Sequence, residues 1–80
     1  MQKTALVTGA ASGIGRAIAL RYATAGARVV VSDVDEDGGI ETVSLIEQAG
    51  GTARFVAADV SDPDACAELV SRTVEAYSGL

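Results

Sequence analysis

The sequence is short of the residue types on which many active sites depend. It has no histidine, no tryptophan, one cysteine and one proline among 80 residues. Without histidine, neither a Ser-His-Asp triad nor a histidine-ligated metal site can form within these residues. Cys66 alone supports neither a disulfide framework nor a zinc cluster. We therefore expect no metal centre and no nucleophilic triad in this chain.

Positive charge is also scarce. Six Lys and Arg residues stand against eleven Asp and Glu residues, which gives a formal net charge of −5. Nucleic-acid binding depends on basic residues that neutralise phosphates, so we expect no nucleic-acid partner. No apolar run approaches the ~20 residues of a membrane helix, and no signal peptide is recognisable. We expect no membrane partner and a cytoplasmic location.

The most informative stretch is the run from Thr8 to Gly15, which contains Gly9 and Gly13 as well. An apolar run precedes it and helix-favouring residues follow, so it joins a strand to a helix. Glycines let the backbone turn sharply and approach a pyrophosphate closely. Unpaired N–H groups at the start of the helix attract the anion. The pattern predicts a dinucleotide-binding loop, and an ordinary strand-to-helix turn is the alternative.

Asp33 follows a β-branched run, residues 29–32, that indicates a buried strand. It lies 20 residues after Gly13, the spacing at which an acidic residue binds the adenosine ribose of a dinucleotide. A carboxylate there accepts hydrogen bonds from both ribose hydroxyls and repels the additional phosphate of NADP. Three acids follow at 35–37, and positions 29–53 contain no Lys or Arg. The sequence predicts NAD as the cofactor; a solvated loop carboxylate is the alternative.

The periodicity predicts three strand–helix units. The expected strands are Thr4–Val7, Arg28–Asp33 and Arg54–Ala58, and the expected helices are Gly13–Ala25, Gly39–Ala49 and a third beginning at Ser61 or Asp62. The third helix should bury one face made by Cys66, Leu69, Val70, Thr73, Val74 and Tyr77. This is an α/β pattern, and it predicts the N-terminal βαβαβα portion of a Rossmann-type doubly wound parallel sheet. The second and third strands are expected on one side of the first.

The Thr-Gly-x-x-x-Gly-x-Gly pattern of residues 8–15 resembles the cofactor motif of the short-chain dehydrogenase/reductase family. The resemblance implies that Ser12 and Ile14 help to bind the cofactor phosphates, Ile14 through its backbone, within the loop of Gly9, Gly13 and Gly15. It also implies that the threonine holds the shape of the turn by bonding to main chain.

Asp59 and Val60 follow the third predicted strand. In the family that this chain resembles, an Asp followed by an aliphatic residue at this strand end contacts the adenine ring. The resemblance implies that the Asp59 side chain binds the exocyclic amine and that the Val60 backbone meets a ring nitrogen. The alternative is turn chemistry before the next helix.

The resemblance covers essentially all 80 residues, but only the first part of a family chain. The Asn-Asn-Ala-Gly strand end, the catalytic serine and the Tyr-x-x-x-Lys pair are absent, so no catalytic residue is assigned. Residues 1–80 are expected to be the N-terminal part of a single NAD(P)-binding Rossmann domain. The resemblance implies an NAD-dependent oxidoreductase that transfers a hydride to or from an alcohol or carbonyl substrate, as a homo-oligomer at full length.

Two other classes of function remain as alternatives. A non-catalytic NAD(H)-binding module shares every feature above. A nucleoside-binding transferase, such as an S-adenosylmethionine methyltransferase, also has an acid at its second strand end, but its ligand has no pyrophosphate. Arg16, just after the loop, has two interpretations: it lies near the cofactor phosphates, or it is a surface residue of the first helical turn.

Overall fold

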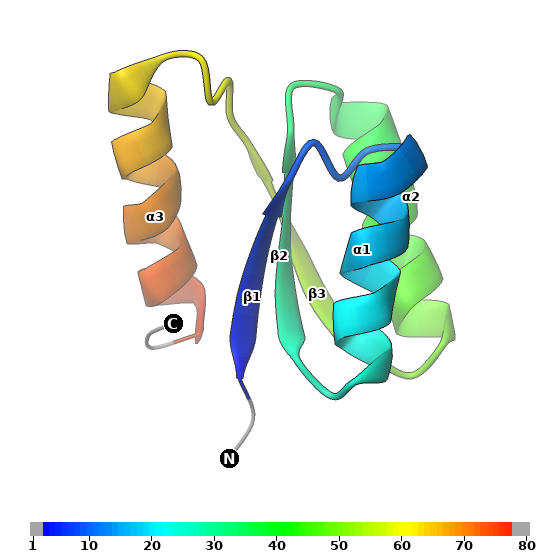
Figure 1. The fold of residues 1–80 in the computed structure, drawn as a ribbon. Coiled ribbons are helices and arrows are strands. Elements are labelled where there is room, and N and C mark those ends of the chain that lie inside the picture. Colours follow the sequence, from blue (N-terminus) through cyan, green and yellow to red (C-terminus); the bar gives the residue numbers. More distant parts are fainter. Residues whose placement is uncertain (1–2, 78–80) are drawn as a thin grey trace.

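Strands and helices alternate along the chain in the computed structural model (Figure 1), which describes residues 3–77 and the side chains of residues 3–73. The strands are β1 (Thr4–Thr8), β2 (Arg28–Asp33) and β3 (Thr52–Ala57), and the helices are α1 (Gly13–Thr24), α2 (Glu36–Gln48) and α3 (Pro63–Tyr77). This is the predicted βαβαβα order, with some element ends shifted.

The strands form one parallel sheet in the order β1-β2-β3. Thr8 at the end of β1 pairs with Ser32, and Asp33 at the end of β2 pairs with Ala57. Because the strands are parallel, their carboxyl ends share one edge of the sheet, at the top of Figure 1. Among the described residues β1 pairs with β2 alone, so the second and third strands lie on one side of the first, as predicted.

Helices cover both faces of the sheet (Figure 1), with α1 and α2 on one face and α3 on the other. The core between the sheet and the helix pair contains Val29 and Val31 of β2, Ala19 of α1 and Ile46 of α2, all fully buried. Val30, between the two core valines, is buried on the opposite face. Burial on both faces explains why β2 is a continuous run of valines instead of an alternating pattern.

The start of α2 was predicted wrongly: it begins at Glu36, not at Gly39. The Asp35 carboxylate accepts a hydrogen bond from the Gly38 N–H at 3.1 Å and so caps the helix. Gly38 and Gly39 therefore lie inside the helix, where neighbouring atoms leave no room for a side chain. A Cβ on Gly39 would overlap the ring of Phe55, and one on Gly38 would lie 2.9 Å from the Cβ of Ala11.

The beginning of α3 agrees with the prediction. The Asp62 carbonyl accepts from the Cys66 N–H at 3.0 Å, and the Asp62 carboxylate accepts from the Asp64 N–H at 3.0 Å, so Asp62 caps the helix. Leu69 and Thr73 are buried as expected.

Burial of Cys66 was predicted wrongly, since its side chain is exposed. In Figure 1 the first turn of α3, which contains Cys66, lies beyond the carboxyl ends of the strands. Val70 was also expected to be buried but is 42% exposed. The expected burial of Val74 and Tyr77 concerns side chains outside the described residues.

Candidate functional site

The loop between β1 and α1 has the backbone that its glycines allow. Gly9 and Gly13 have φ angles of 64° and 57°, in the left-handed region that other residues rarely adopt. A Cβ built on either residue would meet no atom within 4 Å, so the space beside the loop is open. At Gly15 the requirement is different, because a Cβ there would overlap the carbonyl oxygen of Gly9.

Helix α1 presents its N-terminus to this open space. Ser12 is its N-cap residue, but the Ser12 hydroxyl makes no capping hydrogen bond. The first N–H groups of a helix have no carbonyl of a preceding turn to bind. Those of Gly13, Ile14 and Gly15 are therefore available to an anion, which the positive end of the helix dipole also attracts. The Ile14 side chain itself is 82% exposed.

The Asp33 carboxylate lies at the end of β2 and is already part of a hydrogen-bond network. Its Oδ2 accepts from the Ala11 N–H at 3.0 Å, and its Oδ1 accepts from the Asp35 N–H at 3.0 Å. The bond from Asp35, then that from Ala11, holds the pKa of Asp33 below its usual value, against a smaller opposing effect of burial. Asp33 is therefore an anion at neutral pH, directly linked to the glycine-rich loop.

Asp59 takes part in the turn that follows β3. Its Oδ1 accepts from the Ser61 hydroxyl at 2.6 Å and from the Ser61 N–H at 3.0 Å. These two bonds lower the pKa of Asp59, so this carboxylate is also ionised at neutral pH. The turn chemistry that was considered as an alternative is present, and it occupies one carboxylate oxygen. The other oxygen and the half-exposed Val60 remain available.

The three strand ends enclose a single hollow of about 200 Å³. It is lined by Thr8, Gly9, Ser32, Asp33, Val34, Ala58, Asp59 and Val60. Four of the predicted site residues thus lie around one space: Gly9, Asp33, Asp59 and Val60. The other four, Ser12, Gly13, Ile14 and Gly15, continue from it along the loop into α1 and do not line it.

The sequence analysis missed Val34, Ala58 and Ser32 as lining residues. Val34 left a recognisable signal, because it is an apolar residue inside an acidic turn, and in the structure it is 69% exposed. Thr8 lines the hollow too, but its hydroxyl makes no hydrogen bond to main chain within the described part of the structure.

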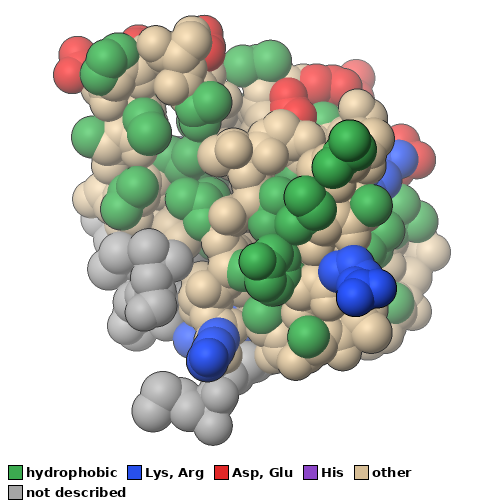
Figure 2. Space-filling view, viewed as in Figure 1, with side chains coloured by type: hydrophobic (Ala, Val, Ile, Leu, Met, Phe, Trp, Pro, Cys, Tyr) green, Lys and Arg blue, Asp and Glu red, His purple; other side chains and the backbone are tan. Residues whose placement is uncertain are grey.

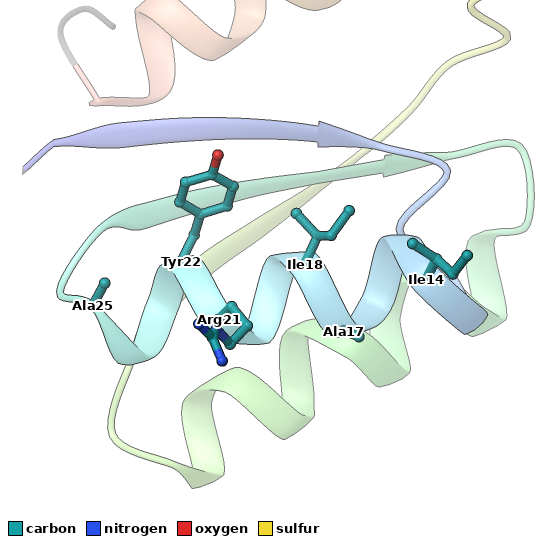
Figure 3. Close-up of a pocket in the computed structure, with 6 residues that line it drawn as sticks. All are labelled: Ile14, Ala17, Ile18, Arg21, Tyr22 and Ala25. Atoms are coloured by element: carbon teal, nitrogen blue, oxygen red, sulfur yellow. The ribbon is translucent and has the colours of Figure 1, made fainter.

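A larger hollow, of about 560 Å³, lies beside α1, and its lining differs in chemistry from that of the hollow at the strand ends. Figure 3 shows Ile14, Ile18 and Tyr22 projecting from the same side of the helix, toward β1. Arg21 is the one charged residue in its lining. This surface has few groups that could fix the hydroxyls and phosphates of a nucleotide, so we assign the candidate site to the strand ends.

Comparison with known proteins shows which family has this arrangement. The family model described as short chain dehydrogenase matches residues 3–80. The chain belongs to the short-chain dehydrogenase/reductase family. The crystal structure of a dehydrogenase/reductase from Sinorhizobium meliloti 1021 superimposes with a TM-score of 0.93 at 47% identity. The superposition covers 98% of this chain and 31% of the Sinorhizobium chain. The predicted Rossmann-type fold is thereby confirmed.

Curated dehydrogenases are also similar over nearly the whole chain. A 3beta-hydroxysteroid dehydrogenase of Mediterraneibacter gnavus is 46% identical over 79 residues, which is 99% of this chain and 29% of that protein. The 2,5-dichloro-2,5-cyclohexadiene-1,4-diol dehydrogenase LinX of Sphingobium indicum is 44% identical over 78 residues, 98% of this chain and 31% of LinX. The chain therefore spans about a third of the length of these relatives.

The surface around the site of this short-chain dehydrogenase/reductase chain is acidic. Figure 2 shows Asp and Glu side chains at the top of the view, where the strands of Figure 1 end. The residues that follow β2, Asp35, Glu36 and Asp37, are all exposed. The described residues contain no group of three or more His, Cys, Asp or Glu placed to hold a metal. Nor does any helix of this part of the chain have the length and apolar character needed to span a membrane.

Proposed function

We propose that the chain is the cofactor-binding part of an NAD-dependent oxidoreductase, and that residues 1–80 form the N-terminal part of a single Rossmann domain. One observation carries the proposal. The glycine-rich loop, the anionic Asp33 and the Asp59–Val60 turn meet at one edge of the sheet around one hollow. Ligands of open α/β sheets bind at this carboxyl edge.

The residues present fit a dinucleotide in both shape and chemistry. The open space beside Gly9 and Gly13 can admit a pyrophosphate close to the backbone. The N–H groups at the start of α1, from Gly13 and Ile14, would bind it, with Ser12 beside them. Gly15 would let the helix approach the loop closely enough to hold this arrangement.

The hollow would receive the adenosine half of the cofactor. Asp33 would bind the ribose hydroxyls, with the lone pairs that its two backbone hydrogen bonds leave free. The free oxygen of Asp59 would accept the adenine amine, and the Val60 backbone would meet a ring nitrogen.

Charge favours NAD over NADP as the cofactor. Asp33 is ionised, and the turn after it adds three more carboxylates. A second phosphate on the ribose would face this cluster. Arg16 is the basic residue at the start of α1, but its guanidinium is bound to carbonyls of the protein, including that of Ala11 at 2.6 Å.

When bound, a nicotinamide cofactor supplies or accepts a hydride. We propose an alcohol or carbonyl compound as the substrate class, because the relatives above are named as steroid and cyclohexadienediol dehydrogenases. A homo-oligomeric state and a cytoplasmic location belong to the same proposal.

The test is a binding panel on the intact protein as its source makes it. NADH and S-adenosylmethionine are titrated separately, and each is then tested for displacement of the other. The proposal predicts that NADH binds and that S-adenosylmethionine neither binds comparably nor displaces it. Tight S-adenosylmethionine binding without NADH binding would overturn the proposal. If NADH binds, formation of NADH from added NAD+ and a panel of alcohols separates an oxidoreductase from a non-catalytic module.

A further inference from the structure

Arg16 turns back over the glycine-rich loop instead of reaching into solvent. Its Nη2 donates to the carbonyl oxygen of Ala11 at 2.6 Å and lies 3.2 Å from that of Gly38 in α2. Its Nε donates to the hydroxyl oxygen of Thr42 at 2.9 Å. An ion pair with the exposed Glu41, at 3.6 Å, adds little, since exposed pairs contribute only weakly. The sequence left the role of Arg16 open between a phosphate contact and a surface residue; in the structure its guanidinium is bound to the loop and to α2.

Thr42 continues this chain of hydrogen bonds into the core. It is fully buried, and its hydroxyl has a single hydrogen to donate. The shorter of its two acceptor distances is 2.7 Å, to the carbonyl oxygen of Ala10; that of Gly38 lies at 3.1 Å. Arg16, Thr42 and Ala10 are thus linked in series, and each bond polarises the next.

The N–H groups of Ala10 and Ala11, whose carbonyls are bound by Thr42 and Arg16, also make hydrogen bonds within the protein. The Ala10 N–H donates to the carbonyl of Ser32 at 3.1 Å, and the Ala11 N–H donates to Asp33 at 3.0 Å. All four backbone polar groups of Ala10 and Ala11 are therefore bound. We call this pair and its partners the loop anchor. The anchor leaves the N–H groups that follow Ser12 to face a ligand.

Packing between the loop and α2 points to the same contact independently. A Cβ added to Gly38 would lie 2.9 Å from both the Cβ and the carbonyl oxygen of Ala11. The loop therefore rests directly on the first turns of α2. A glycine within that helix costs about 1 kcal/mol relative to alanine. The close contact with Ala11 explains why a glycine is nevertheless present at position 38.

We propose that Arg16 and Thr42 are positioning residues for the cofactor. They fix Ala10 and Ala11, and so set the direction of the N–H groups at the start of α1 relative to the Asp33 carboxylate. Neither side chain touches the cofactor. The inference rests on the proposed function, since it concerns how the same site holds a pyrophosphate.

The test compares variants of the intact protein for binding of NADH, ADP and adenosine. Thr42→Val removes the hydroxyl and keeps the shape, Thr42→Ser keeps the hydroxyl, and Arg16→Met removes the guanidinium. Arg21→Met is the matched control, because Arg21 is an exposed arginine of the same helix. Adenosine lacks phosphate, so it reports on the hollow separately from the loop. Thermal melting of each variant confirms that binding is measured on folded protein.

We expect Thr42→Val and Arg16→Met each to weaken NADH and ADP by about tenfold, as lost charge-assisted hydrogen bonds would. Adenosine should change by less than about threefold, and Thr42→Ser and Arg21→Met should bind NADH as the wild type does. The double variant should lose more than either single one, because Thr42 holds the Ala10 carbonyl while Arg16 also holds that of Ala11 directly. The Thr42→Val and Thr42→Ser comparison decides the matter if Arg16→Met does not fold.

Two results would overturn the inference and leave the proposed function standing. One is wild-type NADH affinity in Thr42→Val. If Arg16→Met nevertheless lost affinity, Arg16 would be a direct phosphate ligand. The other is an equal loss in Arg21→Met, which would mean a general effect of positive charge. A wild-type protein that binds neither NADH nor ADP would overturn the proposed function, and this inference with it.

Discussion

Replacing Asp33 by Asn should change which cofactor the protein prefers. The substitution keeps the size of the side chain and removes its charge. The carboxylate accepts two backbone N–H groups, from Ala11 and Asp35, and the amide has only one oxygen to accept them. One N–H therefore loses its partner, and the loop is disturbed. This loss affects NADH and NADPH alike, so it cancels in the ratio of their dissociation constants.

Two further effects do not cancel. A hydrogen bond to a charged acceptor contributes about 1.5–3 kcal/mol and one to a neutral acceptor about 1 kcal/mol, so NADH loses roughly 0.5–2 kcal/mol. NADPH is relieved of repulsion on its ribose phosphate, which at ~5 Å amounts to about 1–3 kcal/mol per charge pair. Together these changes lower the preference for NADH by at least about tenfold.

Calorimetric titration of both cofactors into the wild type and the variant measures this ratio. Asp37→Asn is the control, because Asp37 is exposed in the same acidic turn and makes the same change in net charge. The ratio should fall more in Asp33→Asn than in Asp37→Asn, because Asp37 belongs to the acidic cluster but is not proposed to bind the ribose. An unchanged ratio in Asp33→Asn would refute the assignment of Asp33 to the ribose, and an equal fall in both would show that only overall charge matters.

Three other predictions follow from the same geometry. Gly13→Val should abolish binding of both cofactors, because φ is 57° there and the side chain would enter the open space of the loop; retained affinity in titrations would mean that the phosphates bind elsewhere. The pKa of Asp33 is lower in the folded protein than in the unfolded chain, so ionised Asp33 stabilises the fold at any pH above its unfolded pKa. This stabilisation is lost as the pH falls through the pKa of the folded state. Acid melting curves should therefore be shallower below about pH 4 in Asp33→Asn than in the wild type, and identical curves would contradict the network. The 80 residues alone should associate with rising concentration through the open side of β1 and the apolar side of α1, where Ile18 is 42% exposed. Sedimentation should show less association in Ile18→Lys, and a concentration-independent monomer would contradict this.

Most of the architecture could be predicted because local signals agreed with the tertiary structure. The valine run of β2 and the glycine after α1 each mark an element by mechanisms that act within a few residues. The start of α2 could not be predicted in this way. A pair of glycines is a weak helix signal, and Gly38 and Gly39 are tolerated because Ala11 and Phe55, distant in sequence, press against them.

Similar reasoning separates the predictable from the unpredictable parts of the site. Gly9 and Asp33 were recognisable because their roles depend on fixed positions at strand ends. The contacts of Arg16 with α2 were not, since Gly38 and Thr42 approach it only when α2 folds against the loop. The exposure of Cys66 was missed because helical periodicity shows which residues share a face but not how far the sheet extends beneath it.

The most direct test of the account is a crystal structure of the intact protein with NADH bound. The account predicts the pyrophosphate against the N–H groups of Gly13 and Ile14, and both adenosine ribose hydroxyls within hydrogen-bond distance of Asp33. It also predicts the adenine between Val34 and Val60. A cofactor bound away from the carboxyl edge of the sheet, or a ribose that leaves Asp33 without contact, would contradict it.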